Sequence, residues 1–112
     1  MVIIMSFDWK EFQEVGEHLE NYSVEESYQR SAVGRYYYSC YHTVKSYFEN
    51  KYYSLGFVNN PHETLINCLK YYENEDEVEL AEALSKLRKY RNKADYYSGF
   101  RNNMVRKAKK NF

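Results

Sequence analysis

Apolar residues recur three and four positions apart along most of this chain, and no segment alternates apolar with polar residues as a half-buried strand would. Residues that interrupt helices are scarce, with four glycines and one proline in 112 residues. The pattern therefore predicts an all-α protein. Four helices are expected, and an antiparallel four-helix bundle is the economical way to bury their apolar faces.

The first two helices are expected to be joined by a short turn. The first follows Ser6 and ends near Asn21. The second opens with Ser23-Val-Glu-Glu26, a capping box in which the Ser and Glu side chains satisfy each other's end amides, and runs to about Glu49. The apolar face of the first helix contains Trp9, Phe12, Val15 or Gly16, and Leu19.

The last two helices carry clear start signals. The third opens with Asn60 as the cap, proline at the first helical position and Glu63 three residues after the cap. The fourth opens with Asn74, and acidic residues that suit the positive end of the helix dipole follow it. It should continue to about Tyr97, where Ser98 and a glycine end it.

The fourth helix carries an apolar stripe with one charged position. The stripe consists of Leu80, Leu84, Leu87 and Ala94. Arg91 lies where the spacing calls for another apolar residue. A guanidinium in such a position is costly unless its hydrogen-bond donors are satisfied. An internal carboxylate, a second subunit or an anionic ligand could satisfy them, and these three alternatives stay open.

Charge is distributed unevenly, although the net charge of the whole chain is zero. Residues 1–85 carry six lysines and arginines against fifteen aspartates and glutamates, whereas residues 86–112 carry ten against one. Such a basic segment favours head-to-tail self-association or a surface for a polyanion; a solvated helix end with a frayed tail is the alternative. We expect one domain over residues 1–112, with an ordered core about 6–98 and a short basic C-terminal segment 99–112.

Two groups of polar and aromatic residues are candidate sites. Arg88, Arg91, Asn92 and Asp95 share one face of the fourth helix, because they are three and four positions apart. Weak surface pairs within this patch are the alternative reading. On the second helix, stacked tyrosines beside an arginine could hold unpaired bases, and a histidine could act as an acid or base. That group contains Arg35, Tyr37, Tyr38, Tyr41 and His42, and packing inside the bundle is its alternative explanation.

The remaining reactive residues give no clear signal. His62 lies at a predicted helix start, and His18 has the surroundings of a surface residue. Cys40 and Cys68 have no metal-ligand spacing and are interpreted as small buried hydrophobes in a reducing compartment. We expect no metal and no cofactor. The apolar start is too short to span a membrane, so a cytoplasmic protein is expected.

Three segments, in this order, resemble small prokaryotic HEPN-domain proteins. They are Asp8-Trp-Lys-Glu-Phe12, Tyr28-Gln-Arg-Ser-Ala-Val-Gly-Arg-Tyr-Tyr-Tyr38 and Leu87-Arg-Lys-Tyr-Arg-Asn-Lys-Ala-Asp-Tyr96. The resemblance covers residues 7 to about 100. It implies a helical bundle that forms a homodimer and works in a toxin–antitoxin or antiviral defence module, often beside a nucleotidyltransferase. Active members are metal-independent endoribonucleases.

The chain departs from the active family pattern at one position. Active members have an arginine, usually a polar residue after it, and a histidine four to six residues from the arginine; no histidine follows His62 in this chain. The resemblance carries Arg91 and Asn92 over as the polar start of the motif. Tyr96 or His42 would then have to transfer the proton, and a tyrosine is a poor base at neutral pH.

These observations predict an RNA-associated, HEPN-like homodimer with a degenerate endoribonuclease motif. The predicted catalytic residues are Arg91, Asn92 and Tyr96, and the predicted RNA-binding or interface residues are Arg88, Lys93, Asp95, Arg35, Tyr38 and His42. The alternative is a non-catalytic subunit that binds a nucleotidyltransferase or another defence effector protein. A nucleotide- or RNA-binding bundle unrelated to defence is a third hypothesis.

Overall fold

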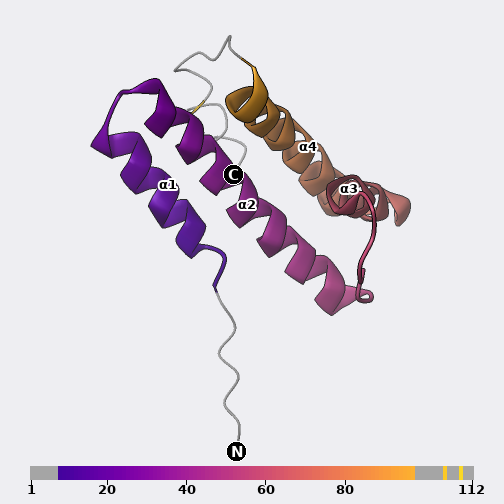
Figure 1. Cartoon of the computed structure of the whole chain (residues 1–112). Helices are drawn as coiled ribbons and strands as arrows, with labels where there is room; N and C mark the ends of the chain where they lie inside the picture. Colours follow the sequence, from indigo (N-terminus) through magenta and orange to yellow (C-terminus); the bar gives the residue numbers. More distant parts are fainter. Residues whose placement is uncertain (1–7, 98–104, 106–108, 110–112) are drawn as a thin grey trace, which may run out of the picture.

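The structure, a computed structural model, describes residues 8–97, 105 and 109. Within this part of the chain there are four α-helices and no strand: α1 (Glu11–Tyr22), α2 (Glu26–Lys51), α3 (Pro61–Tyr71) and α4 (Glu75–Tyr96) (Figure 1). The prediction of an all-α chain with four helices is confirmed. The predicted basic segment 99–112 lies outside the described residues, apart from Val105 and Lys109.

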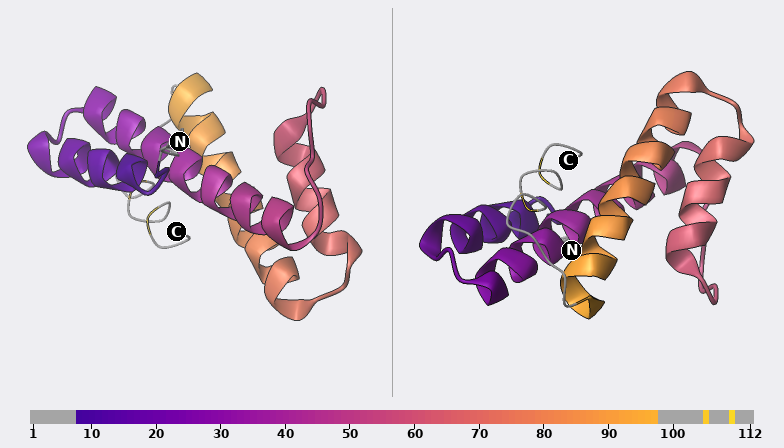
Figure 2. Two further views of the ribbon diagram at one scale, coloured as in Figure 1. Left: turned by 90° about the horizontal axis from the view of Figure 1, so that it is seen from below. Right: turned by 90° about the horizontal axis from the view of Figure 1, so that it is seen from above.

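α2 is the central helix of the arrangement. α1 folds back along the first part of α2, α4 packs against α2 from another side, and α3 packs mainly against α4 (Figures 1 and 2). The first and third helices therefore lie toward opposite ends of the molecule (Figure 2). Because α2 has neighbours on several sides, aromatic as well as aliphatic side chains of this helix are buried. The largest of them are Tyr36, Tyr37 and Phe48.

α1 approaches α2 closely at Gly16, which is the buried residue of α1. The sequence leaves Val15 and Gly16 as alternatives for this face, and in the structure Gly16 is buried whereas Val15 is 44% exposed. A Cβ atom on Gly16 would lie 2.6 Å from Cε1 of the buried Tyr36 ring. The Tyr36 hydroxyl donates a hydrogen bond of 2.6 Å to Glu20 Oε1, which fixes this ring against α1.

Gly16→Ala is expected to lower the free energy of unfolding by about 1–2 kcal/mol. Overpacking a core site costs about 1–3 kcal/mol, and the helix propensity of alanine returns up to about 1 kcal/mol. Urea unfolding followed by circular dichroism measures the difference. Gly34→Ala is the matched control, since a Cβ on Gly34 would meet nothing within 4 Å and alanine should stabilise α2 there. Equal effects of the two substitutions would contradict the close approach at Gly16.

The predicted starts of α3 and α4 are confirmed, and the predicted start of α2 is corrected. α3 begins at Pro61 with Asn60 in the cap position, although the Asn60 side chain makes no capping hydrogen bond. Asn74 caps α4, because its Oδ1 accepts a 3.1 Å hydrogen bond from the Glu77 amide. The capping box predicted before α2 is wrong: Ser23 Oγ accepts from the Glu25 amide, and the Glu26 carboxylate lies near Arg30. α2 begins at Glu26, two residues later than a box capped by Ser23 requires, so Ser23 forms a turn before the helix.

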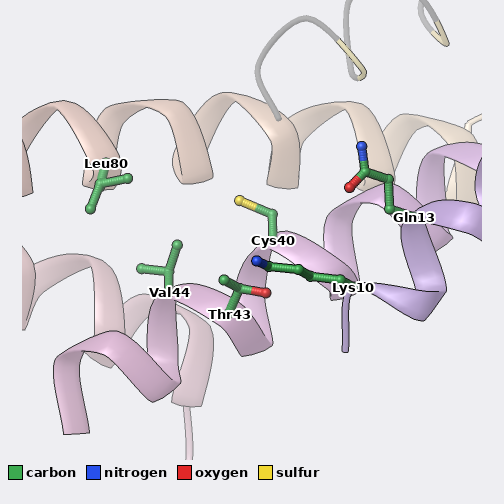
Figure 3. A pocket seen from close by; sticks show the side chains of 6 residues that line it. All are labelled: Lys10, Gln13, Cys40, Thr43, Val44 and Leu80. Atoms are coloured by element: carbon green, nitrogen blue, oxygen red, sulfur yellow. The ribbon is translucent and has the colours of Figure 1, made fainter. Parts of the chain in front are cut away.

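The buried stripe of α4 differs from the predicted one at its first turn. Ala81, Leu84, Leu87 and Ala94 are buried as their spacing requires, but Leu80 is 36% exposed. Leu80 lines a pocket of about 190 Å³ between α2 and α4, opposite Val44 and beside Cys40 (Figure 3). Lys10, Gln13 and Thr43 form the rest of its lining. The buried face of α4 therefore includes Ala81 and not Leu80, and one turn earlier it includes Glu77.

Glu77 is a fully buried carboxylate that joins the end of α2 to the start of α4. Tyr52 donates to both carboxylate oxygens, at 2.5 and 2.9 Å, and the Tyr47 hydroxyl donates to Oε2 at 2.9 Å. Lys51 Nζ makes an ion pair of 2.9 Å with the same oxygen. Burial by itself would raise the pKa of Glu77, but the hydrogen bonds and the ammonium outweigh it and hold the pKa below its usual value.

None of the described helices combines the length and the apolar character that crossing a bilayer requires.

Candidate nucleic-acid interface

Arg91 extends from α4 over the tyrosines of α2. Its guanidinium carbon lies 5.1 Å from the centroid of the Tyr37 ring and 5.7 Å from that of Tyr38, a cation–π geometry. Only 11% of the Arg91 side chain is exposed. The inward direction that the stripe predicted for this residue is therefore present in the structure.

Asp95, the internal partner of Arg91, satisfies the hydrogen-bond donors of its guanidinium only in part. Asp95 Oδ2 lies 3.6 Å from Nη1 of Arg91, beyond normal hydrogen-bond length, and the Asp95 side chain is 41% exposed. Within the described chain, the buried Nε atoms of Arg91 and Arg88 have no hydrogen-bond partner. Two guanidiniums whose buried Nε donors are unsatisfied therefore lie one turn apart on α4.

A surface hollow of about 230 Å³ lies next to Arg91. Tyr38, which forms part of its wall, is also one of the rings beneath the Arg91 guanidinium. Gly34 contributes backbone without a side chain to its wall, and a Cβ there would meet no atom within 4 Å. The lining residues of the hollow are Ser31, Gly34, Arg35, Tyr38 and Asp95. The structure thus brings together three residues that the sequence singled out on two separate helices.

His62, from the first turn of α3, lies on the other side of the same tyrosines. Its Nδ1 is hydrogen-bonded to the hydroxyl of the buried Tyr37, and its ring centroid lies 4.3 Å from that of Tyr41. Burial lowers the pKa of His62 to about 4, and the charges of Arg91 and Arg88 act in the same direction. His62 is therefore neutral near pH 7.

Tyr37 keeps its proton at neutral pH. Burial raises the pKa of its hydroxyl, and the positive charges of Arg91 and Arg88 offset this effect only in part. The Tyr37 hydroxyl can therefore either donate to His62 Nδ1 or accept from it, depending on the tautomer of the imidazole.

His42 occupies the edge of this aromatic group. Its ring stacks on Trp9 with centroids 3.6 Å apart, and Tyr41 lies edge-on at 4.9 Å. Burial and the nearby Lys45 lower its pKa. The packed position agrees with the alternative interpretation of His42 as a core histidine, although its ring also contributes to the charge that His62 experiences.

The structure does not bring every predicted residue to Arg91. Tyr96 is 73% exposed, and five residues along an α-helix correspond to a rotation of about 140° from Arg91. Lys93 is exposed on another side, where its backbone carbonyl accepts a 3.3 Å hydrogen bond from Arg30. Asn92 is half-buried. The proton-transfer role predicted for Tyr96 has no support in this geometry.

His62 is the residue that sequence reasoning missed. Its place at a helix start suggested an inert capping position, and its partner Tyr37 is 25 residues away. The pattern of a single helix carries no signal of such a contact. The one available hint was that α3 begins at Pro61, which fixes the start of the helix and hence the position of the next side chain.

Within the described part of the chain, no group of three histidine, cysteine, aspartate or glutamate side chains could hold a metal ion. Comparisons with protein-family models, with curated proteins and with solved structures find no match to this chain. The contacts, burial and charges of the residues around Arg91 are therefore the basis for assigning a function.

Proposed function

We propose that this chain is a HEPN-like protein that binds single-stranded RNA in the hollow between α2 and α4. One observation carries the proposal. The guanidinium of Arg91, mostly buried and incompletely satisfied, lies over the Tyr38 ring, and Tyr38 lines an open hollow that also presents Arg35. A phosphodiester carries acceptor oxygens that could pair with the Arg91 guanidinium and with the exposed Arg35.

RNA suits this hollow better than a free inorganic anion. An unpaired base can stack on the Tyr38 ring, and the bare backbone at Gly34 leaves room for a planar group. The strongly basic composition of residues 86–112 adds long-range attraction for a polyanion. Asp95 would release Arg91 when a phosphate binds, because its exposed carboxylate can turn into solvent.

The arrangement of helices supports the HEPN-like part of the proposal. Two of the three resembling segments lie on α2 and α4, and they contact each other through Arg91, Tyr37 and Tyr38. We further propose an antiparallel HEPN-like bundle that acts as a cytoplasmic homodimer in a defence or toxin–antitoxin module. A nucleotidyltransferase or a defence effector protein is the proposed partner.

Cleavage of the bound RNA is a second candidate function. It is favoured by one observation: Arg91 and His62 contact the same buried tyrosine, Arg91 over the Tyr37 ring and His62 at its hydroxyl. A site with two arginines and a histidine contains groups that could stabilise a pentacoordinate phosphate and move a proton.

Gly34 offers a direct test of RNA binding. Gly34→Glu should weaken binding of a labelled oligouridylate at least tenfold, about 1.4 kcal/mol, because the side chain fills the hollow with bulk and negative charge. Fluorescence anisotropy at low salt measures the dissociation constant. Gly34→Gln, which adds the bulk without the charge, should give an intermediate loss.

Gly34→Ala is the control for this test, since it barely fills the hollow and should bind RNA as the unaltered protein does. None of the three substitutions meets a neighbouring atom at the Cβ position, so folding should be preserved. Unchanged binding by the Gly34→Glu variant would show that the hollow is not the RNA site. A change in oligomer mass in place of weaker binding would instead favour a protein partner at this surface.

A further inference from the structure

Asp95 is an acidic residue at a position where the helix itself disfavours one. It lies in the last turn of α4, at the negative end of the helix dipole. Its partner Arg91 precedes it by four residues, which is the less favourable order for an acid–base pair on a helix. The charged atoms of this pair are 3.6 Å apart, and the Asp95 side chain is 41% exposed. The stability of α4 therefore accounts poorly for a carboxylate here.

Arg30 of α2 holds the end of α4 beside the hollow. Its Nη1 donates hydrogen bonds of 3.3 and 2.7 Å to the carbonyl oxygens of Lys93 and Ala94, the two residues before Asp95. The Ala94 side chain is buried in the core. The backbone that carries Asp95 is therefore fixed against α2, and the short Asp95 side chain stays close to the hollow.

Asp95 contributes the acidic group to the lining of this hollow of about 230 Å³. From α2, Tyr38 contributes an aromatic residue, Arg35 a cation and Gly34 backbone without a side chain. One hydrogen-bond acceptor, one stacking surface and one cation thus line the same space. A nucleotide can use all three, because it combines a planar base with hydrogen-bonding edges and a phosphate.

The carboxylate of Asp95 determines which base fits best. An ionised carboxylate only accepts hydrogen bonds. Guanine presents two adjacent donors on its Watson–Crick edge, N1–H and the N2 amino group. Adenine and cytosine place a ring-nitrogen acceptor beside their amino group, and uracil has one donor between two carbonyl oxygens. An acceptor that faced the carboxylate would repel it, so guanine is the base that can pair with both of its oxygens.

We propose that Asp95 makes the hollow selective for guanine. The base stacks on the Tyr38 ring and donates through N1–H and the N2 amino group to the Asp95 carboxylate, and Arg35 pairs with the neighbouring phosphate. Asp95 exchanges its long contact with Arg91 for these two donors. No covalent bond forms or breaks, and no proton is transferred. The inference rests on the proposed RNA-binding function and deepens it by naming the base.

Four labelled oligomers of one length test the selectivity by fluorescence anisotropy. One is all uridine, and the others carry a single guanosine, inosine or adenosine at the same internal position. The unaltered protein should bind the guanosine oligomer about tenfold more tightly than the all-uridine one, as expected for a bidentate contact with a base. Inosine has N1–H and lacks the N2 amino group, so its affinity should be intermediate. The adenosine oligomer should bind no more tightly than the inosine oligomer.

Asp95→Asn should remove the preference for guanosine without weakening binding of the all-uridine oligomer. The amide keeps the shape of the side chain, loses the charge and replaces one acceptor with a donor. Glu82→Gln is the matched control, since it removes one negative charge from an exposed position of α4 outside the lining of the hollow. It should keep the full preference. Thermal unfolding checks that both variants fold.

The failures of the two proposals give different results. Equal affinity for the four oligomers, or a preference that Asp95→Asn retains, would overturn the guanine selectivity and leave RNA binding intact. Absence of binding of every oligomer by the unaltered protein would overturn both. If Asp95→Asn does not fold, the order of the four affinities for the unaltered protein still decides. Adenosine bound as tightly as guanosine would then overturn the selectivity, and the order given above would support it.

Discussion

Replacing Glu77 with alanine is expected to lower the free energy of unfolding by about 2–3 kcal/mol. The substitution leaves the hydroxyls of Tyr47 and Tyr52 and the ammonium of Lys51 without their shared acceptor. Removal of one partner from a buried charged network commonly costs about 3–5 kcal/mol. We expect less here, since Tyr47 and Lys51 are partly exposed and can bind water. Urea unfolding measures the effect.

Glu77→Gln separates charge from shape. Glutamine keeps the volume and one acceptor oxygen but loses the charge, so it should cost less than alanine and should also remove part of the acid sensitivity. Because the folded-state pKa of Glu77 is below its usual value, its contribution is complete above the unfolded pKa of about 4.3 and is lost as the pH falls below it. Equal stability of all three proteins would show that this network does not hold α2 to α4.

Replacing Arg91 with methionine is expected to weaken RNA binding at least tenfold without lowering the melting temperature. Methionine keeps the apolar stem that covers Tyr37 and removes a guanidinium whose Nε is buried without a partner. An apolar side chain of similar volume in place of a buried charge is often neutral or stabilising. Anisotropy with an oligouridylate and thermal unfolding give the two readouts.

The opposite pair of results would identify Arg91 as structural. If methionine lowers the melting temperature and leaves RNA affinity unchanged, the ion pair with Asp95 is the reason for an arginine here. Incubation of the unaltered protein and the variant with total RNA and EDTA tests cleavage in the same series. RNA that is cut by the unaltered protein alone would favour the endoribonuclease candidate, and RNA left intact by both would favour a binding role.

The positions of the helices can be predicted from the sequence because they depend on local spacing and caps. The fourth helix was expected from Asn74 to about Tyr97, and α4 runs from Glu75 to Tyr96. The burial of Arg91 can be predicted for the same reason, since a charged residue within an apolar stripe is visible from the spacing of a single helix. Its partners cannot be predicted, because spacing along α4 says nothing about which rings of α2 it meets.

Glu77 and Leu80 show why a single-helix pattern misassigns residues. An acidic residue in the first turn of a helix is already explained by the helix dipole, so nothing in the sequence marks Glu77 as buried. Its burial depends on Tyr47, Tyr52 and Lys51, which reach it from the end of α2. Leu80 fits the stripe by spacing, yet the neighbouring helices do not cover that side of α4.

The central place of α2 has a consequence for how the protein unfolds. Its 26 residues correspond to about 39 Å of helix, close to the 41 Å longest extent of the molecule. α1 has its main packing partner in α2, and α4, which supports α3, packs on α2 as well. Loss of α2 removes the main packing partner of α1 and leaves α3 and α4 in contact with each other alone. We therefore expect the described helices to melt in one cooperative transition.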